Sequence, residues 1–268
     1  MTAVDFEAFV AELAAKAGEV ILPFFRSAMV ARDKTRGGVF DPVTEADRAA
    51  ETAMRRMILQ TFPAHGIVGE EFGDHQPDAE YVWVLDPIDG TKSFISGLPL
   101  WGTLVALQHH GRPAYGTMHQ PFTRERFFGD GVRATWTGPG AGGNKATHTL
   151  RTRPCPTLAE ATLMTTSPLL MSADEHLAYA RVEAAVRLPR FGGDCYSYCM
   201  LAAGHVDLVI EAGLKPYDIA PLIPIVKGAG GVVTTWAGGD AAKGGRVIAA
   251  GDPRVHAAAL ALLAANGG

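Results

Sequence analysis

The stretch WVLDPIDGTKSF (83–94) constrains this chain more than any other part of its sequence. The apolar run from Tyr81 to Leu85 has the residues of a buried β-strand, yet it leads directly into two carboxylates, Asp86 and Asp89. Like charges this close raise each other's pKa and resist burial. The chain must therefore fold so that a cation lies between these side chains, or so that each one caps a turn, since Asp-Pro and Asp-Gly are common turn dipeptides.

Apolar residues recur at regular spacing along the first half of the chain. The spacing predicts one long amphipathic helix over residues 4–27 and a second over 45–61, with Thr44 as its N-cap. Short apolar runs bounded by glycine and proline predict strands, several of them in an antiparallel meander. The predicted strands cover residues 67–71, 81–86, 102–108, 114–119 and 126–129.

Helices and strands alternate in the second half as well, which predicts an α/β protein built in layers. We expect an N-terminal half over residues 1–150 and a C-terminal half over 151–268. The elements predicted in the C-terminal half are helices at 174–187, 194–204, 218–229 and 253–265 and strands at 206–211, 231–236 and 247–250.

Composition excludes several classes of function. The chain has 268 residues, 47% of them hydrophobic and 19% charged, with a net charge of −4, which is typical of a globular protein and leaves no basic stripe for a nucleic-acid polymer. Its apolar stretches are too short for a membrane span, and its N-terminus carries acids where a signal peptide needs basic residues. An odd set of cysteines (Cys155, Cys195 and Cys199) favours a reducing compartment, so we expect a cytoplasmic protein.

Acidic residues stand at the ends of several predicted elements. Glu70 follows a strand, Asp86 and Asp89 flank a turn, and Asp218 opens a helix, where it could serve simply as an N-cap. Oxygen ligands from separate segments are what Mg²⁺ requires, since it prefers octahedral oxygen coordination and is usually held by few carboxylates plus phosphate and water. The carbonyl of Ile88 could add a further ligand. Together these residues predict a magnesium site.

WVLDPIDGTKSF resembles the main motif of the inositol monophosphatase superfamily of Mg²⁺-dependent phosphatases. Further segments resemble that family's other motifs, in the same order along the chain: VTEAD (43–47), GIVGEE (66–71) and YDIAPLIPIVKGAGG (217–231). The resemblance covers nearly the whole chain. It implies alternating α-β-α-β-α layers of the inositol monophosphatase or sugar phosphatase type, a homodimer, and hydrolysis of a phosphate monoester by metal-activated water with two or three Mg²⁺ ions.

Carried onto matching positions of this chain, the resemblance also implies a role for individual residues. Thr91, hydrogen-bonded to Asp47, would work with Glu70 to orient the attacking water, and the backbone N–H groups of Gly90 and Thr91 would hold the phosphate. Lys34 is similar to a family lysine on a loop. The implied metal ligands are Glu70, Asp86, Asp89, Asp218 and the Ile88 carbonyl.

The segment RFGGDCYSYCMLAAGHVDLVIEAGLKPYD (190–218) resembles the histidinol-phosphatase branch of the family, which serves histidine biosynthesis. It adds one acid, Asp194, where the family's sugar and inositol phosphatases commonly have small or hydroxyl residues after the paired glycines. A second acid, Glu211, stands seven residues before Asp218, where the family has a substrate-contacting glutamate. A cationic substrate would balance this charge, and histidinol phosphate carries an ammonium and an imidazole. The residues expected to contact substrate are Asp89, Arg190, Asp194, Glu211 and Asp218.

Alternatives remain open for the substrate segment. Asp194 could be merely a helix N-cap, and Glu211 could be a surface strand end. Arg190 could orient the two acids or face a neighbouring subunit. The substrate could also be an inositol or sugar phosphate, in which case the activity is that of an inositol monophosphatase or a related enzyme.

Other patterns are interpreted as structural. The stretch TGPGAGGNK (137–145) resembles a phosphate-binding loop but has Asn144 where a lysine belongs, so a hairpin turn is predicted. His109 and His110 end a strand beside a glycine and predict a solvated turn rather than a metal site. The apolar meander over 98–118 is expected to supply the dimer face that the resemblance implies.

Overall fold

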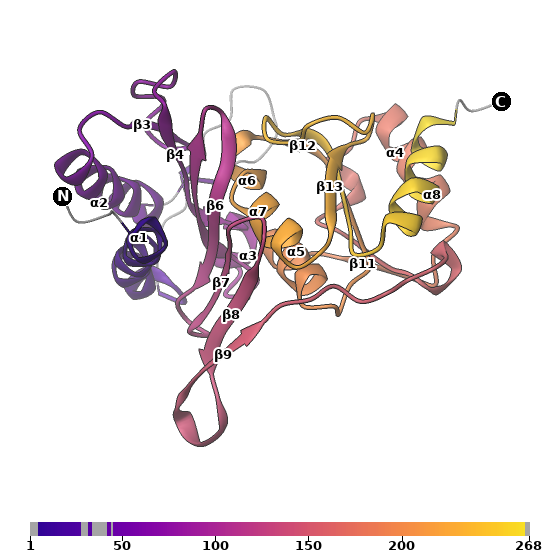
Figure 1. The fold of residues 1–268 in the computed structure, drawn as a ribbon, viewed down its shortest axis with the longest axis horizontal. Helices are drawn as coiled ribbons and strands as arrows, with labels where there is room; N and C mark the ends of the chain where they lie inside the picture. Colours follow the sequence, from indigo (N-terminus) through magenta and orange to yellow (C-terminus); the bar gives the residue numbers. More distant parts are fainter. Residues whose placement is uncertain (1–4, 28–31, 34–41, 44, 266–268) are drawn as a thin grey trace.

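The computed structural model describes residues 5–27, 32–33, 42–43 and 45–265, and it is built from two β-sheets with helices between them and on both outer sides (Figure 1). The layers are, in order, helices α1 (Phe6–Ile21) and α2 (Glu45–Thr61), a seven-stranded sheet, helices α5 (Cys195–Ala202), α6 (Pro216–Ile219) and α7 (Leu222–Gly228), a five-stranded sheet, and helices α4 (Ala173–Glu183) and α8 (Pro253–Ala264). The predicted α-β-α-β-α layering is confirmed.

The seven-stranded sheet runs in chain order from β3 to β9. Its first pair, β3 and β4, is parallel, and all the others are antiparallel, as the predicted meander requires. The strands are β3 (Gly66–Gly69), β4 (Tyr81–Asp89), β5 (Gly102–His109), β6 (Arg112–Gln120), β7 (Glu125–Gly129), β8 (Ala134–Pro139) and β9 (Lys145–Thr149). The hairpin predicted over 137–145 is the connection between β8 and β9.

The five-stranded sheet has the order β11-β10-β12-β14-β13, with parallel pairs at the β11 side and antiparallel pairs at the β13 side. Its strands are β10 (Thr162–Thr165), β11 (Leu188–Phe191), β12 (Leu208–Leu214), β13 (Val232–Thr235) and β14 (Gly245–Ala250). The remaining short elements are β1 (Arg32–Asp33), β2 (Pro42–Val43), α3 (Thr91–Ile95) and the 3-10 turns Leu22–Phe24, Ala141–Gly143, Leu158–Glu160 and Pro168–Leu170.

Proline accounts for two differences from the predicted helices. The helix expected over 4–27 ends at Ile21 and tightens into a 3-10 turn that contains Pro23. The helix expected over 218–229 is instead two helices that meet at Pro221. Proline lacks the N–H that an α-helix needs and clashes with the preceding turn. Strands β10 and β11 were not predicted, and Thr44 lies outside the described residues.

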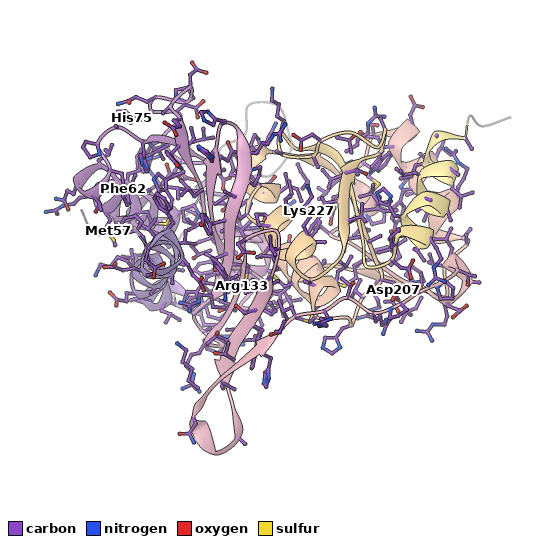
Figure 2. All side chains as sticks on the ribbon, in the orientation of Figure 1. Met57, Phe62, His75, Arg133, Asp207 and Lys227 are labelled. Carbon is purple, nitrogen blue, oxygen red and sulfur yellow. The ribbon has the colours of Figure 1, made fainter. Side chains whose placement is uncertain are left out.

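Side chains fill the space between the layers (Figure 2). One apolar cluster joins α1 and α2 to the outer face of the seven-stranded sheet, and its largest members, Trp83 and Trp101, have no exposed surface. A second cluster lies between the two sheets around α5 and α7. These packed layers place α6 against β4 and α5 against β12. Across the described parts of the chain, no helix is both long and apolar enough to cross a membrane.

Candidate active site

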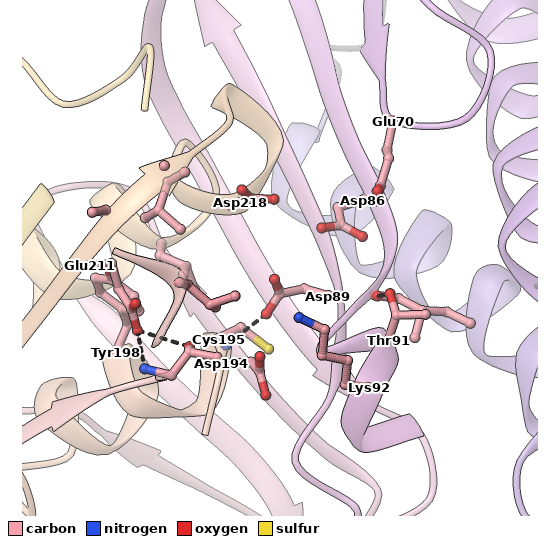
Figure 3. A pocket seen from close by; sticks show the side chains of 18 residues that line it. Glu70, Asp86, Asp89, Thr91, Lys92, Asp194, Cys195, Tyr198, Glu211 and Asp218 are labelled. Atoms are coloured by element: carbon pink, nitrogen blue, oxygen red, sulfur yellow. Dashed lines mark hydrogen bonds between the residues drawn. The ribbon is translucent and has the colours of Figure 1, made fainter. Parts of the chain in front are cut away.

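A cavity of about 380 Å³ opens where the two sheets meet, at the end of β4 (Figure 3). This volume is within the usual range for small-molecule sites. Both halves of the sequence contribute to its walls, which include segments that follow β3, β4 and β10 and residues of α5, β12 and α6. The acids that line it are Glu70, Asp86, Asp89, Asp194, Glu211 and Asp218.

The end of β4 directs two carboxylates into this cavity. In a regular strand, residues three apart point to opposite faces of the sheet. The pairing of β4 with β5 is irregular between Asp86 and Asp89, and this bulge brings both side chains to the same side. The bulge therefore explains how the two acids that end this apolar strand can both face the cavity.

Asp218 completes a group of three carboxylates. It lies in α6, where its Oδ2 accepts a hydrogen bond of 2.7 Å from the backbone N–H of Lys215. One oxygen from each of Asp86, Asp89 and Asp218 lies within 4.8 Å of the others. Glu70, directly after β3, extends toward Asp86 in the same cavity (Figure 3). The four acids predicted from separate segments are thus brought together.

The electrostatics of this group favour a bound cation. Burial raises the pKa of Asp86 well above its usual range, and the charges of Glu70, Asp89, Asp218 and Asp47 raise it further. Burial and the charges of Asp194 and Asp218 likewise raise the pKa of Asp89. Asp86 Oδ1 is buried and has no hydrogen-bond partner among the described residues. A hard divalent ion would satisfy that oxygen and offset the repulsion, so these residues fit magnesium.

The turn after β4 exposes backbone N–H groups beside the acids. Gly90 has a φ of +86° and precedes α3, and Thr91 is the first residue of that short helix. The Thr91 hydroxyl donates a hydrogen bond of 3.1 Å to the Ile88 carbonyl. Asp47, on α2, is 3% exposed and its charge acts on Asp86, but the predicted Thr91–Asp47 bond stays a prediction.

Asp194 stands on the opposite wall of the cavity. It precedes α5 but makes no side-chain capping bond there, and its φ is +45°. Its Oδ2 instead accepts a hydrogen bond of 3.1 Å from Ser93 Oγ, and burial raises its pKa. The next residue, Cys195, donates its backbone N–H to Asp89 Oδ2 at 2.7 Å, which ties the two walls together. The helix-capping alternative for Asp194 does not describe this arrangement.

Glu211 is deeply buried on β12, with 5% of its surface exposed, so it is not a surface strand end. Its Oε1 accepts bonds from the backbone N–H of Thr166 at 2.6 Å and from the hydroxyl of that residue at 2.9 Å, and its Oε2 accepts one from Thr165 Oγ1 at 3.2 Å. Burial raises its pKa to about 7, although these hydrogen bonds oppose the change. The hydrogen bonds fix the carboxylate in the cavity wall.

Comparison with known proteins shows which family of proteins has this arrangement of acids. A model of the inositol monophosphatase family matches residues 4–267. The chain belongs to the inositol monophosphatase family. It is therefore a metal-dependent phosphomonoesterase, and members of this family use Mg²⁺ ions.

The chain is similar to several members of the family that are described as different phosphatases. It is 46% identical over 260 residues to the bifunctional phosphatase IMPL2, chloroplastic, of Arabidopsis thaliana, covering 92% of this chain and 72% of that protein. A histidinol-phosphatase of Chlorobaculum parvum is 34% identical, with 85% and 84% covered. The structure of an inositol monophosphatase from Zymomonas mobilis superposes with a TM-score of 0.84 at 40% identity, covering 97% of this chain and 99% of that one.

Two cavity residues of this family member were not predicted from the sequence. Lys92 is the one basic residue among the described residues that line the cavity, and it extends toward Asp89 (Figure 3). Tyr198, on α5, is 2% exposed, and its buried hydroxyl lacks a hydrogen-bond partner within the described chain. Tyr198 lies three residues after Cys195 on the same helix, so the two side chains are neighbours on one helix face. This spacing was the sequence signal that could have placed Tyr198 beside Cys195 at the site.

Arg190, a predicted substrate contact, does not line the cavity. It is exposed on β11, at the edge of the five-stranded sheet. Its role as a substrate contact or subunit contact stays a prediction. Lys34 lies outside the described residues.

Proposed function

We propose that this family member hydrolyses L-histidinol phosphate to L-histidinol and phosphate, as a step of histidine biosynthesis. The observation that carries the proposal is the presence of two acids, the partly buried Asp194 and the buried Glu211, on the wall away from the Glu70 and Asp86 side. A phosphate ester needs cations near its phosphate, and these two acids are not among the residues assigned to the metals. They suit the positive groups of an organic moiety.

The residues assigned to the metals are Glu70, Asp86, Asp89, Asp218 and the Ile88 carbonyl. Mg²⁺ held by these residues would neutralise the phosphate, lower the pKa of a water molecule and stabilise the leaving oxygen. Six acids and one lysine line the cavity within the described chain, so a doubly charged phosphate would be repelled without such ions. The protein's own contribution is to hold these oxygens at fixed positions through the bulge of β4 and the capping bond of Asp218.

The turn over Gly90 and Thr91 is assigned to the phosphate oxygens, through backbone N–H groups that point out of the start of α3. A glycine with positive φ allows the backbone to approach a ligand closely. Thr91 and Glu70, with Asp47 behind them, are assigned to orienting the water that attacks the phosphorus. Positioning and electrostatics supply most of the catalysis in phosphoryl transfer, so no covalent intermediate with the protein is required.

The organic part of the substrate is assigned to the opposite wall. Histidinol carries an ammonium and an imidazole, and Asp194 and Glu211 offer one carboxylate to each. Because Thr165 and Thr166 already hold Glu211 in place, a bound cation would gain a charge-assisted hydrogen bond without ordering a flexible side chain. A cationic group would also offset the cost of ionising a buried carboxyl.

Similarity supports this substrate without deciding it. The relatives described as a bifunctional phosphatase and as a histidinol-phosphatase favour histidinol phosphate. The 40% identity to the Zymomonas mobilis inositol monophosphatase favours the alternative, an inositol or sugar phosphate. Asp194 is the feature that we use to choose, because a neutral polyol gains less from an additional carboxylate than a substrate with an ammonium group does.

The test is a parallel phosphate-release assay on L-histidinol phosphate and myo-inositol 1-phosphate with Mg²⁺ present. We expect a higher kcat/KM for histidinol phosphate, and no turnover of either ester after chelation with EDTA. A higher kcat/KM for inositol phosphate would refute the substrate. Turnover that survives metal removal would refute the whole assignment of the acids.

Two further expectations extend this proposal. We propose a homodimer and a cytoplasmic location, although one relative is described as chloroplastic. Within the segment 98–118, Leu98 and Leu100 are 52% and 39% exposed, and they are the apolar side chains that a partner subunit would cover. Arg190 is exposed and available to the same kind of contact.

A further inference from the structure

A second cluster of metal-ligating side chains lies at the other end of β4 from the acids of the active site. Glu80 directly precedes β4, and His109 and His110 stand where β5 turns into β6. Tyr81 pairs with His109 across the sheet, and the backbone N–H of His110 donates a 2.8 Å hydrogen bond to the Glu80 carbonyl. The register of the sheet therefore places these three residues side by side.

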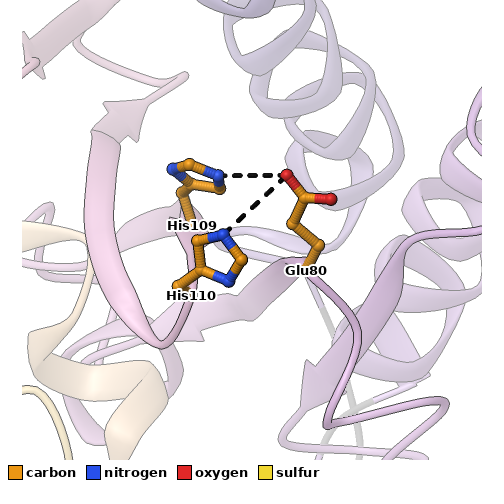
Figure 4. Close-up of side chains that lie close together, drawn as sticks. All are labelled: Glu80, His109 and His110. Atoms are coloured by element: carbon orange, nitrogen blue, oxygen red, sulfur yellow. Dashed lines mark hydrogen bonds and ion pairs between the residues drawn. The ribbon is translucent and has the colours of Figure 1, made fainter.

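The conformation of the turn brings the two imidazoles to the same side. Neighbouring residues of a regular strand point to opposite faces. His110 instead has a φ of +49°, in the left-handed region, and Gly111 follows with +73°. As a result the two rings lie 4.3 Å apart between centroids, and both turn toward Glu80 (Figure 4). The ring of His109 is also stacked on Tyr81 at 4.6 Å, which restricts its orientation.

The ligand atoms are spaced for a small metal ion. Glu80 Oε1 lies 3.2 Å from His109 Nε2 and 3.9 Å from His110 Nε2. One ligand atom from each residue lies within 4.8 Å of the others. Tetrahedral zinc, with bonds of about 2.0–2.1 Å, needs ligand atoms about 3.3 Å apart. All three side chains are at least partly exposed, which leaves them room to move closer to an ion.

We propose that Glu80, His109 and His110 bind a divalent transition-metal ion, with Zn²⁺ as the best match. Two imidazole nitrogens and one carboxylate oxygen form a three-ligand set that zinc accepts, with a fourth position left to water. Imidazole suits zinc, copper and nickel, whereas magnesium prefers oxygen alone. The cluster therefore selects a different class of metal from the acids around Asp86.

The two sites are separate in space as well as in chemistry. Glu80 and Asp86 are six positions apart along an extended strand, which at 3.3 Å per residue is a separation of about 20 Å. An ion at Glu80 would fasten the start of β4 to the turn between β5 and β6. Binding to the folded chain alone would raise the stability of the protein, without taking part in ester hydrolysis.

The test uses variants that keep the local backbone. His110→Asn removes the imidazole but keeps a residue that tolerates positive φ, and Glu80→Gln removes the charge at nearly constant size. Zn²⁺ binding to the full-length protein is measured by competition with a chromophoric chelator in saturating Mg²⁺, with Co²⁺ absorption as a second readout. His176→Gln, on the exposed side of α4, is the matched control.

We expect the unaltered protein and the His176→Gln control to bind one Zn²⁺ more per chain than the combined Glu80→Gln, His110→Asn variant. Each single change should weaken the binding of this Zn²⁺ ion about tenfold or more, while Mg²⁺-dependent phosphatase activity is unchanged. Equal Zn²⁺ stoichiometry and affinity in the control and the combined variant would overturn the proposal. Retained phosphatase activity in that variant shows that it is folded, so a loss of Zn²⁺ binding is not attributable to unfolding.

Discussion

Replacing Glu211 with Gln should stabilise the metal-free protein at neutral and alkaline pH while it weakens binding of a cationic substrate. The ordinary pKa of this carboxyl is 4.5, and burial raises it to about 7 in the folded chain. Each pKa unit corresponds to about 1.4 kcal/mol, so ionising Glu211 in the fold costs about 3 kcal/mol. The amide stays neutral, and its oxygen can still accept the two bonds from Thr166.

The pH dependence of unfolding determines whether the variant is more or less stable than the unaltered protein. Between the unfolded and folded pKa values the folded state keeps a proton that the unfolded state has lost, so stability falls as pH rises through that window. We therefore expect the Glu211→Gln variant and the unaltered protein to have similar urea unfolding free energies at roughly pH 4. At roughly pH 8 the variant should be more stable by up to about 3 kcal/mol.

The same variant tests the role of Glu211 in binding. Loss of a charge-assisted hydrogen bond of about 1.5–3 kcal/mol should raise the KM for histidinol phosphate by about 10- to 100-fold. Hydrolysis of p-nitrophenyl phosphate, which carries no cation, is the control and should keep its KM. A variant that is less stable than the unaltered protein across the whole pH range would refute the reasoning, because Glu211 would then be a structural anchor.

Three other substitutions test the rest of the site. Asp89→Asn should reduce kcat at least about 100-fold with an unchanged circular dichroism spectrum, since it removes a predicted metal ligand, and unaltered turnover would contradict the assignment. Gly90→Ala should lower the free energy of unfolding in urea by about 1–3 kcal/mol, because the φ of Gly90 is +86° and the added Cβ would lie 2.8 Å from the Leu100 carbonyl oxygen. Tyr198→Phe should leave the melting temperature unchanged or raise it, as a buried hydroxyl without a described partner costs about 1–3 kcal/mol, and a lower melting temperature would reveal a hidden structural bond.

The elements that could be predicted from sequence are those with a strong local cause. Helix α2 has the predicted bounds of Glu45 to Thr61, because its apolar positions recur at helical spacing over four turns. The antiparallel meander was also predictable, since glycine and proline separate its apolar runs. Strands β10 and β11 are four residues long and carry little periodicity, so their existence depends on pairing with β12 and with each other.

The residue types of the site were likewise determined by the sequence. Each acid taken singly could cap a turn or a helix, but acids from separate segments taken together indicated a cation among Asp86, Asp89 and Asp218. Sequence spacing could not show that a bulge turns Asp86 and Asp89 to one side, because a bulge is defined by the neighbouring strand. Nor could it show that Asp194 is held by Ser93, which lies 101 positions away.

The clearest case is the pair of histidines at 109 and 110. Their sequence predicted an exposed turn, and the turn is there, with His110 at positive φ. The carboxylate that makes them a metal-binding cluster belongs to Glu80, 29 positions earlier, and is brought close by the pairing of β4 with β5. The sequence by itself determined which chemical groups this protein carries and where its strands end. The tertiary structure decided which of those groups meet, because strand register and packing set distances between residues that the chain keeps far apart.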